Sequence, residues 1–426
     1  MQRRLSNVVR PLEGIRVIDF TNAVAGPIAT FILGDLGAEV IKVEEPSGRP
    51  LQAVGTAPLQ PGAPDLSYNR IMVFNELNHG KRGISLNVST EEGRQVFLKL
   101  VAKSDVVVDN YAPRVMPNLR LDYDNLKVVN PRIICISMPA FGLSGPYRER
   151  ISYGPGVDAM SGLSHLTGYP DSSPMKPGNF FCDQNAGVLT ALACMSALRH
   201  RNRTGMGQRI EMPMIDGEFQ VLGDAYIDYW MNKRERTRAG NDHPWMAPHN
   251  VYPCRGDDSW VAIAVANDAQ WAALCDVLGR PELKSDVRFA GQLQRWRNRR
   301  EADRYIAEYT SGLDHREVEA RCQRAGIPAA AVLNAVELLE DEHVRARGGF
   351  EYVDVPGVGP TPYPRVAFKL SGTPVPITKA APGFAEDNDY VYRELLGLSE
   401  DDIRALEEQQ VITSEPIAPG GGRKGH

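Results

Sequence analysis

The chain has 426 residues, and its 48 lysines and arginines are outnumbered by 53 aspartates and glutamates, which gives a formal net charge of -5. This balance excludes a basic nucleic-acid-binding protein as the first interpretation, because phosphate backbones select an excess of cationic side chains. Hydrophobic residues make up 42% and charged residues 24%, so the composition is that of a globular chain with a large core. A chain of this length is expected to form two domains.

The sequence also argues against a membrane or secreted protein and against a protein held together by zinc or disulfides. No apolar run reaches the ~18 residues of a membrane span, and the first residues lack the apolar stretch of a signal peptide, so we expect a cytoplasmic protein. The six cysteines occur without CxxC or HxxxH spacing, which argues against a structural zinc site and a disulfide framework. We expect no metal and predict reduced, mostly buried thiols.

A βαβ unit is predicted at residues 15–44. The apolar run IRVIDF predicts a strand, a helix is expected from near Pro27 to Gly37, and VIKVE predicts the next strand. The connection TNAVAGP between the first strand and the helix contains no GxGxxG fingerprint. A nicotinamide-dependent dehydrogenase therefore loses its main support.

The next segments extend this pattern into an α/β fold. Residues 49–75 are rich in proline, glycine and polar side chains and predict a long surface loop. The runs GISLNV, DVVVDN and IICISM predict strands, with a helix capped by Ser89 after the first of them. Strands that alternate with helices imply a mostly parallel sheet covered on both faces.

The remaining pattern predicts two domain boundaries. Residues 1–230 include the helix GVLTALACMSAL, expected to be buried on all sides, the strand GQRIEM and the long helix IDGEFQVLGDAYIDYWMN. The charged run NKRERTRAG marks a linker, and residues 231–335 are expected to form a smaller α/β domain. The chain is turn-rich from Pro356 and ends with a helix capped by Ser399 and a disordered tail, PIAPGGGRKGH.

Asp183 directly precedes the predicted apolar helix in the segment FFCDQNAGVLTALA. A carboxylate at this position caps free backbone N–H groups and is stabilised by the helix dipole, and a plain N-cap is its commoner role. The alternative is a nucleophile, because the same N–H groups would stabilise the oxyanion that forms on an attacked carbonyl. Spacing alone leaves both interpretations open.

Segments spread in order over nearly the whole chain carry a family resemblance. They are PLEGIRVIDFTNAVAGPIATFILGDLGAEVIKVEEPSG, NHGKRGISLNV, DVVVDNYAPRVM, NPRIICISMPAFGLSGPYRER, MSGLSHLTGYP, the Asp183 segment, RTGMGQRIEMPMIDG, AFKLSGTP and RELLGLSEDDI. Each motif is modest by itself, but their number and order are specific. The chain resembles the family III CoA-transferases, also called the CaiB/BaiF family.

The resemblance implies a large domain with a nucleotide-fold, Rossmann-like parallel sheet built from both chain ends, so residues 336–426 return to it after the small domain. It also implies an interlocked dimer of ring-like subunits, and a heteromer with a homologous subunit stays open. The implied reaction moves CoA from a donor acyl-CoA, for which succinyl-CoA is a candidate, to an organic acid. Coenzyme A thioesters are then substrates, and no tightly bound cofactor is expected.

The family's nucleophilic aspartate corresponds to Asp183. It would attack the donor thioester to give a mixed anhydride, which CoA thiolate converts into an aspartyl-CoA thioester before the acceptor acid reverses the sequence. Tyr153 is assigned to the catalytic site together with Asp183, because it corresponds to a position beside the thioester where α-methylacyl-CoA racemases carry a histidine base. The neighbouring Ser152 is assigned to substrate binding. Tyrosine titrates at about pH 10 and is a poor base at neutral pH, which disfavours a racemase.

Five further residues are assigned to CoA or substrate binding through the resemblance. Val24 and Ala25 correspond to positions that border CoA and the acyl group. Leu86 corresponds to a residue beside the adenine, and Asn110 and Tyr111 correspond to an Asn-Phe pair that contacts CoA. Formyl-CoA transferases have glutamine where Val24 stands, so oxalate and formate are disfavoured and a larger or less polar acyl group is expected.

Two alternative functions remain open. One is an acyl-CoA racemase or isomerase of the same fold, in which Asp183 acts as a base. The other is a non-catalytic partner subunit, because Asn118 replaces a basic residue that is frequent in the family and its loss would weaken a CoA site. Arg114 or Arg120 is then a hypothetical ligand for a CoA phosphate.

Overall fold

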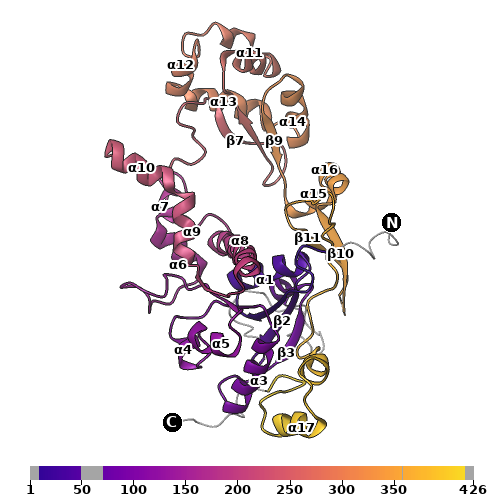
Figure 1. Ribbon diagram of the computed structural model, residues 1–426. Coiled ribbons are helices and arrows are strands. Elements are labelled where there is room, and N and C mark those ends of the chain that lie inside the picture. The colour runs from indigo at the N-terminus through magenta and orange to yellow at the C-terminus, as the bar shows by residue number, and fades with distance from the viewer. Residues whose placement is uncertain (1–8, 49–70, 357, 418–426) are drawn as a thin grey trace. The chain divides into compact units, whose positions relative to one another are not determined.

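The computed structural model describes residues 9–48, 71–356 and 358–417 (Figure 1). The chain divides into two compact units. The larger unit falls within Met1–Leu163, Lys176–Lys233 and Gly348–His426, and the smaller one comprises Ser164–Met175 and Arg234–Arg347. The predicted loop at 49–75 lies outside the described residues as far as residue 70, and the predicted disordered tail lies outside them from residue 418.

The larger unit is built on a six-stranded sheet in which every strand pair is parallel. Its strands are β1 (Arg16–Phe20), β2 (Glu39–Glu44), β3 (Arg82–Ser85), β4 (Val106–Asp109), β5 (Ile134–Ser137) and β6 (Arg209–Glu211). Their order is β3-β2-β1-β4-β5-β6, so the winding direction reverses between β1 and β4. Doubly wound folds with this order bind ligands beyond the carboxyl ends of the two strands at the reversal. The predicted parallel α/β sheet is confirmed.

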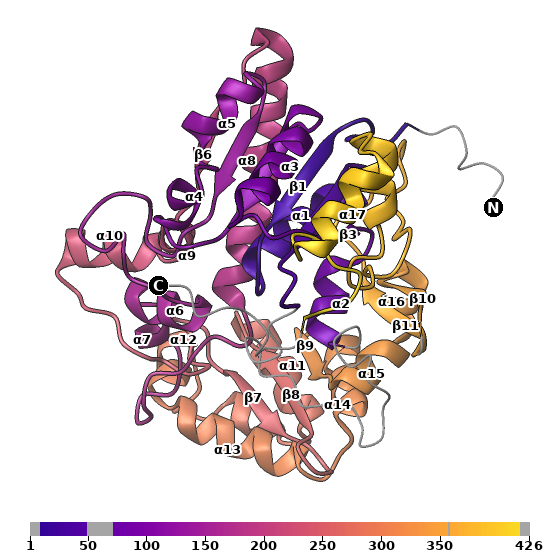
Figure 2. The ribbon, with the colours of Figure 1, turned by 90° about the horizontal axis from the view of Figure 1, so that it is seen from below.

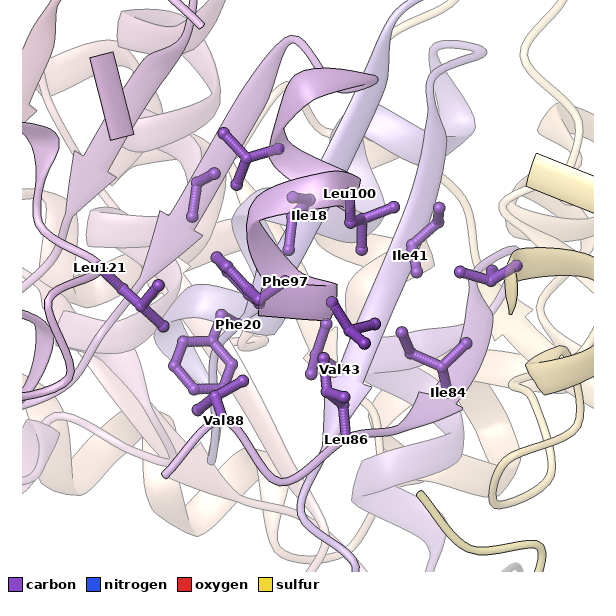
Figure 3. Packing of buried hydrophobic residues seen from close by; sticks show 14 of the residues in the cluster. Ile18, Phe20, Ile41, Val43, Ile84, Leu86, Val88, Phe97, Leu100 and Leu121 are labelled. Carbon is purple, nitrogen blue, oxygen red and sulfur yellow. The ribbon is translucent and has the colours of Figure 1, made fainter. Parts of the chain in front are cut away.

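One face of the sheet carries an apolar core that both ends of the chain build. Ile18 and Phe20 of β1 pack there with Phe97 and Leu100 of helix α3 (Glu91–Ala102) (Figure 3). These four side chains are at most 2% exposed, and the burial of each contributes about 1.5–3 kcal/mol. Residues from the C-terminal part of the chain complete this core.

Helix α17 (Glu400–Glu408), drawn in yellow, belongs to that C-terminal part (Figures 1 and 2). Ile403 and Leu406 of α17 belong to the same buried cluster as Ile84 of β3. The helix starts as predicted, because Ser399 accepts the N–H of Asp402 and the Asp402 side chain accepts the N–H of Ser399. The C-terminal segment is thus part of the larger unit.

The opposite face is covered by two helices that pack closely together, α1 (Ala25–Asp35) and α8 (Phe181–Thr204). A Cβ atom at Gly187 of α8 would lie 2.4 Å from Cγ2 of Ile28 and 3.0 Å from the carbonyl oxygen of Ala25. A side chain at position 187 is therefore incompatible with this helix spacing.

Gly187→Ala is expected to destabilise the protein by about 1–3 kcal/mol, because the added methyl group forces α8 away from α1. Urea unfolding followed by circular dichroism measures the effect. Gly223→Ala is the control, because the Cβ atom at position 223 would meet nothing within 4 Å. Equal stabilities of the two variants would show that α8 can move without cost.

The remaining elements of the larger unit are short. They are α2 (Met72–Asn78), α4 (Val115–Asn118), α5 (Tyr123–Val129), α6 (Gly154–Ser161), α9 (Met214–Val221), α10 (Gly223–Asn232), the π-helix η4 (Tyr390–Leu395) and the hairpin of β10 (Phe350–Val355) with β11 (Gly359–Pro364). Helix α7 (Leu163–Leu166) crosses the boundary between the units. Helix α2 begins inside the segment that was predicted to be a loop.

Several helix predictions need correction. The N-cap of α3 is Thr90, which accepts the N–H of Gly93, because the Ser89 hydroxyl donates to the side chain of Asn87 instead. Helix α8 is not buried on all sides, since Val188 and Leu192 are exposed. The predicted long helix at 215–232 is two helices, which meet at Leu222 and Gly223.

The sequence predicted a turn-rich segment after Pro356, but part of this segment forms strand β11. Its prolines at 360, 362 and 364 occupy alternate positions opposite β10, so their missing N–H groups fall on one side of the strand. A two-stranded hairpin leaves that side without a ladder, and proline is tolerated there.

The smaller unit has an antiparallel sheet in the order β7-β8-β9. Its strands are β7 (His249–Pro253), β8 (Trp260–Ala264) and β9 (Ala329–Val332), and its helices are α11 (Asp268–Val277), η3 (Pro281–Lys284), α12 (Gln292–Arg297), α13 (Arg299–Thr310), α14 (His315–Arg324), α15 (Ala335–Glu340) and α16 (Glu342–Arg347). The core contains Val261, Ile263 and Leu274, all at most 2% exposed.

The smaller unit ends later than the predicted residue 335. The ring of His315 on α14 lies 3.0 Å from a carboxyl oxygen of Glu337 on α15, and Arg316 lies 2.8 Å from Asp341. These contacts tie α15 and the residue after it to α14, so the unit continues to Arg347.

Two further sequence predictions can be compared with the described residues. None of the helices in the described ranges is both long and apolar enough to cross a membrane. All six cysteines lie in those ranges, and each is free and buried, which confirms the prediction of buried thiols.

Candidate active site

A pocket of about 320 Å³ opens beyond the carboxyl ends of β1 and β4, where the winding of the sheet reverses. Six of the eight predicted site residues line it, namely Ala25, Asn110, Tyr111, Ser152, Tyr153 and Asp183. The start of α1 supplies Ala25, the loop after β4 supplies Asn110 and Tyr111, the start of α6 supplies Ser152 and Tyr153, and α8 supplies Asp183. Four separate parts of the chain thus meet at one pocket.

The loops after β1 and β4 are joined by a pair of amide hydrogen bonds. Asn110 accepts the backbone N–H of Asn22 at 2.8 Å and donates its side-chain N–H to the backbone carbonyl of Asn22 at 2.7 Å. The side chain of Asn22 in turn donates to the hydroxyl of Tyr111 at 2.8 Å. The ring of Tyr111 packs at 5.0 Å from that of Phe20, so the wall of the pocket is rigidly connected to the sheet.

The first turn of α1 is held from below by a buried ion network. Asp19 of β1 lies 2.8 Å from Nζ of Lys81 and 3.8 Å from Nζ of Lys42. Burial favours the neutral carboxyl, but the two lysines outweigh it and lower the pKa of Asp19 well below its usual range. Lys81 also donates to the carbonyl of Pro27 and the hydroxyl of Thr30, which fixes the helix above the sheet.

Asp183 lies in the first turn of α8 and is 6% exposed. Its Oδ2 atom has no hydrogen-bond partner among the described residues. Burial, with a smaller effect of the nearby Asp158, raises the pKa of Asp183 to about 6, although backbone hydrogen bonds from Asp183 itself and from Ala25 partly offset the rise. Near neutral pH the carboxyl is therefore mostly ionised, poorly solvated and open to the pocket.

The N-cap of α8 is Phe180 and not Asp183, which corrects the position expected from the sequence. Phe180 has a φ of 58°, a left-handed conformation that is rare for a bulky side chain. Ala23, which precedes α1, also has a φ of 58°. Strained residues of this kind persist where the surrounding packing fixes them, and here they stand before the two helices that carry Ala25 and Asp183.

Gly154 leaves the space that the Asp183 carboxyl occupies. A Cβ atom at position 154 would lie 1.9 Å from Oδ2 of Asp183. Gly154 begins α6 directly after Tyr153, the N-cap of that helix, which is 64% exposed. Ser152 donates its hydroxyl to the carbonyl of Tyr153 at 2.9 Å. The start of α6 thus presents polar groups to the pocket and a bare backbone to Asp183.

The structure places the other two predicted residues elsewhere. Val24 is 3% exposed and packs in a small apolar cluster with Ile28 and Leu77, so its side chain does not line the pocket. Leu86 is 0% exposed and lies in the core next to Val43 (Figure 3). Both are apolar residues whose burial accounts for their identity without a ligand.

A family model described as CoA-transferase family III matches residues 12–388. The chain belongs to this family. The resemblance seen in the sequence and the prediction of a CoA-transferase are thereby confirmed.

Individual proteins with named activities or solved structures are also similar to this chain. The alpha subunit of succinyl-CoA--L-malate CoA-transferase from Chloroflexus aurantiacus is 33% identical over 94% of this chain and 92% of the relative. The succinate--glutarate CoA-transferase of Agrobacterium fabrum is 34% identical over 90% of this chain and 96% of the relative. A CaiB/BaiF family protein from Brucella suis superposes with a TM-score of 0.83 at 33% identity, covering 91% of this chain and 99% of that one.

Sequence reasoning missed several residues that line this pocket. Asn22, Ala23 and Arg150 also line the Asp183 pocket. A neighbouring pocket of about 230 Å³ shares Asn22, Ala23 and Tyr111 with it and extends to Lys42. Lys42 in the run VIKVE was an available signal, because a charged residue in a buried strand needs a partner.

Proposed function

We propose that this family III transferase moves CoA from a donor acyl-CoA to a carboxylic acid and that Asp183 is the covalent nucleophile. The observation that carries the proposal is the Asp183 carboxyl itself, which is buried at the pocket wall with one oxygen unpartnered within the described structure. A carboxylate is activated by such partial desolvation, because its charge is then weakly hydrated.

The first half of the reaction transfers CoA to the enzyme. An Asp183 oxygen attacks the carbonyl carbon of the donor thioester, the carbon–sulfur bond breaks, and CoA leaves as a thiolate. The product is a mixed anhydride between the acyl group and Asp183. The thiolate then attacks the Asp183 carbonyl of the anhydride, which releases the donor carboxylate and leaves an aspartyl-CoA thioester.

The second half repeats these steps with the acceptor. The acceptor carboxylate attacks the aspartyl thioester, CoA leaves again as a thiolate, and a new anhydride forms. Attack of the thiolate on the acceptor acyl carbon gives the product thioester and returns Asp183 as a carboxylate. The N–H of Ala25, which already hydrogen-bonds the carboxyl, would stabilise the negative oxygen in the tetrahedral states that form on the Asp183 carbonyl.

The two adjoining pockets support an elongated ligand. The Asp183 pocket would hold the thioester and the acyl group, with Tyr153 and Ser152 beside them. The second pocket, with Lys42 at its wall, would take a more distant part of CoA past Tyr111. The hydrogen bonds between Asn22 and Asn110 would keep the passage between the pockets in place.

Succinyl-CoA is the proposed donor, because two similar relatives are named as enzymes that act on succinyl-CoA or succinate together with a second dicarboxylic acid. The test is incubation with succinyl-CoA and, one at a time, malate, glutarate and monocarboxylic acids, with product thioesters identified by mass spectrometry. We expect a new thioester with at least one dicarboxylate. Deuterium uptake at the α-carbon of the acyl group without exchange of CoA would instead support an acyl-CoA racemase or isomerase.

The rate of transfer is expected to rise with pH around pH 6. The pKa of Asp183 is raised to about 6, so the carboxyl is protonated and non-nucleophilic below that pH and ionised above it. The measurement is kcat/KM for succinyl-CoA between pH 4.5 and 8, which should fall about tenfold per pH unit on the acid side. A profile that is flat through pH 6 would contradict an Asp183 carboxylate as the attacking group.

We further propose that the chain works as a dimer, either with itself or with a homologous subunit. Apolar side chains are exposed along α8 to α10, including Leu192, Phe219, Ile227, Trp230 and Met231. Exposed apolar surface of this extent is typical of an interaction site. Light scattering of the purified chain decides between a homodimer and a subunit that needs a homologous partner. A homodimer has twice the 47.0 kDa of the chain, whereas a subunit without its partner has that mass alone.

A further inference from the structure

Two acidic side chains are buried together behind Asp183. Asp158 of α6 is 2% exposed and Glu218 of α9 is 0% exposed. One oxygen of each carboxyl and the sulfur of Cys182 lie within 4.8 Å of one another. In the part of the chain that the structure describes, Oδ1 of Asp158 and Oε2 of Glu218 have no hydrogen-bond partner.

The surroundings of this pair supply little positive charge. From α8 it faces the Cys182 thiol, the Asp183 carboxyl and the amide of Asn185; from α10 it faces the phenol of Tyr226; and from the segment before α8 it feels the charge of Lys176. No ion pair joins either carboxyl to a basic side chain of the described ranges. Two buried carboxylates so close together cannot both be ionised without a compensating charge.

The hydrogen bonds to the two carboxyls are unequal. Asp158 accepts the backbone N–H of Cys182, which stabilises its ionised form. Among the described residues, Glu218 receives only the side-chain N–H of Asn185, at 3.4 Å. Because Cys182 immediately precedes Asp183, the bond to Asp158 holds the first turn of α8 at the residue before the nucleophile.

We propose that Glu218 carries a proton that it shares with Asp158, directly or through one water, and that Asp158 thereby serves as a positioning residue for Asp183. The shared proton would give the two unpartnered oxygens their missing hydrogen bond. It would also keep the total charge of the two carboxyls at −1. Asp158 could then accept the N–H of Cys182 as an anion while Glu218 adds no further negative charge near Asp183. The proposal rests on the proposed role of Asp183 only for its activity readout.

The first test uses Glu218→Gln, in which an amide N–H replaces the carboxyl O–H, and compares its Tm with that of the wild type from pH 5 to pH 8. Burial raises the pKa of Glu218. A raised pKa means that the folded wild type binds the extra proton and loses stability as the pH rises, whereas glutamine cannot lose a proton. We therefore expect the Tm of the variant minus the Tm of the wild type to increase by a few degrees between pH 5 and pH 8.

Two results of this first test would overturn the proposal. One is a Tm difference between Glu218→Gln and the wild type that does not change with pH. The other is a fall in the Tm of the wild type when EDTA is added, because the three donor atoms would then be held together by a metal ion instead of a proton.

A spectroscopic measurement detects the proposed proton directly. Infrared spectra of the wild type with isotope-labelled glutamate side chains at pH 8 should contain the carbonyl band of a protonated carboxyl, and this band should be missing from Glu218→Gln. If labelled wild type and variant have the same bands, Glu218 carries no proton.

The positioning role is tested with Asp158→Ala and Asp158→Asn. Alanine removes the acceptor for the N–H of Cys182, so we expect a lower kcat at an unchanged KM for succinyl-CoA. Asparagine keeps an acceptor for Cys182 and a donor for Glu218, so it should restore most of kcat and shift the acid side of the pH profile to lower pH, since Asp183 loses its nearest anion. Equal kcat values for both variants would refute the positioning role. The infrared measurement tests the proton on Glu218 and does not depend on the function of Asp183.

Discussion

Asp183→Asn is expected to lower kcat for CoA transfer by a factor on the order of 10⁴ or more. The amide has the size of the carboxyl but lacks its nucleophilic oxygen, so no anhydride forms. Because burial disfavours the charge of Asp183 above pH 6, the variant should be at least as stable as the wild type at pH 8. Turnover of succinyl-CoA with an acceptor acid and Tm are measured together.

A matched control for this substitution is Asp124→Asn. Asp124 also lies in the first turn of a helix, α5, but its side chain is 70% exposed and pairs with Lys127 on the surface. We expect its turnover to equal that of the wild type, because exposed ion pairs contribute little. Turnover retained in Asp183→Asn would contradict the assigned nucleophile, whatever the control shows.

Gly154→Ala is the second substitution with a large expected effect and should lower kcat by more than about 100-fold. The added Cβ atom would lie 1.9 Å from Oδ2 of Asp183, so the carboxyl must leave its position. The side chain that is changed has no chemistry of its own, and the loss would come from the displaced nucleophile. Steady-state kinetics with succinyl-CoA measure the effect.

The control for Gly154→Ala is Gly223→Ala. Both glycines are the first residue of a helix, α6 and α10 respectively, but the Cβ atom at position 223 would meet nothing within 4 Å. Alanine favours a helix over glycine by about 0.8–1.0 kcal/mol, so neither change is expected to unfold its helix. A Gly154→Ala variant as active as the control would mean that Asp183 does not need its observed position.

The sheet could be predicted from the sequence because its strands are buried on both faces. Runs such as IRVIDF and DVVVDN are apolar at consecutive positions, which is the pattern of a central parallel strand. The extent of the helices was harder to predict. Val188 and Leu192 are apolar and exposed, and an apolar side chain does not reveal whether its cover is the same chain, a partner subunit or solvent.

The start of α8 shows a second limit of sequence reasoning. Aspartate is a residue type that often caps helices, yet α8 begins before Asp183, at Phe181, because Phe180 takes a left-handed conformation. No residue preference predicts that conformation for phenylalanine, since it depends on packing by distant parts of the chain. The consequence is chemical, because Asp183 lies in the first turn of α8 and lines the pocket.

The pocket was partly predictable because a family resemblance located Asp183, Asn110 and Tyr111. Two of the residues assigned through the resemblance do not line the pocket: Val24 lies in the pocket loop after β1 but packs in an apolar cluster, and Leu86 follows β3 and lies in the core. The space left by Gly154 and the closeness of Asp158 to Glu218 arise only when α6 packs against α8 and α9. Contacts between residues so far apart in sequence leave no local pattern.

The central claim is that Asp183 becomes covalently bound during the reaction. The most direct measurement is to incubate the protein with succinyl-CoA, trap with hydroxylamine and map the modified peptides by mass spectrometry. Hydroxylamine converts an aspartyl anhydride or thioester into a hydroxamate, and we predict this modification at Asp183 in the wild type and its absence in Asp183→Asn. An active enzyme with no hydroxamate at Asp183 would contradict the account.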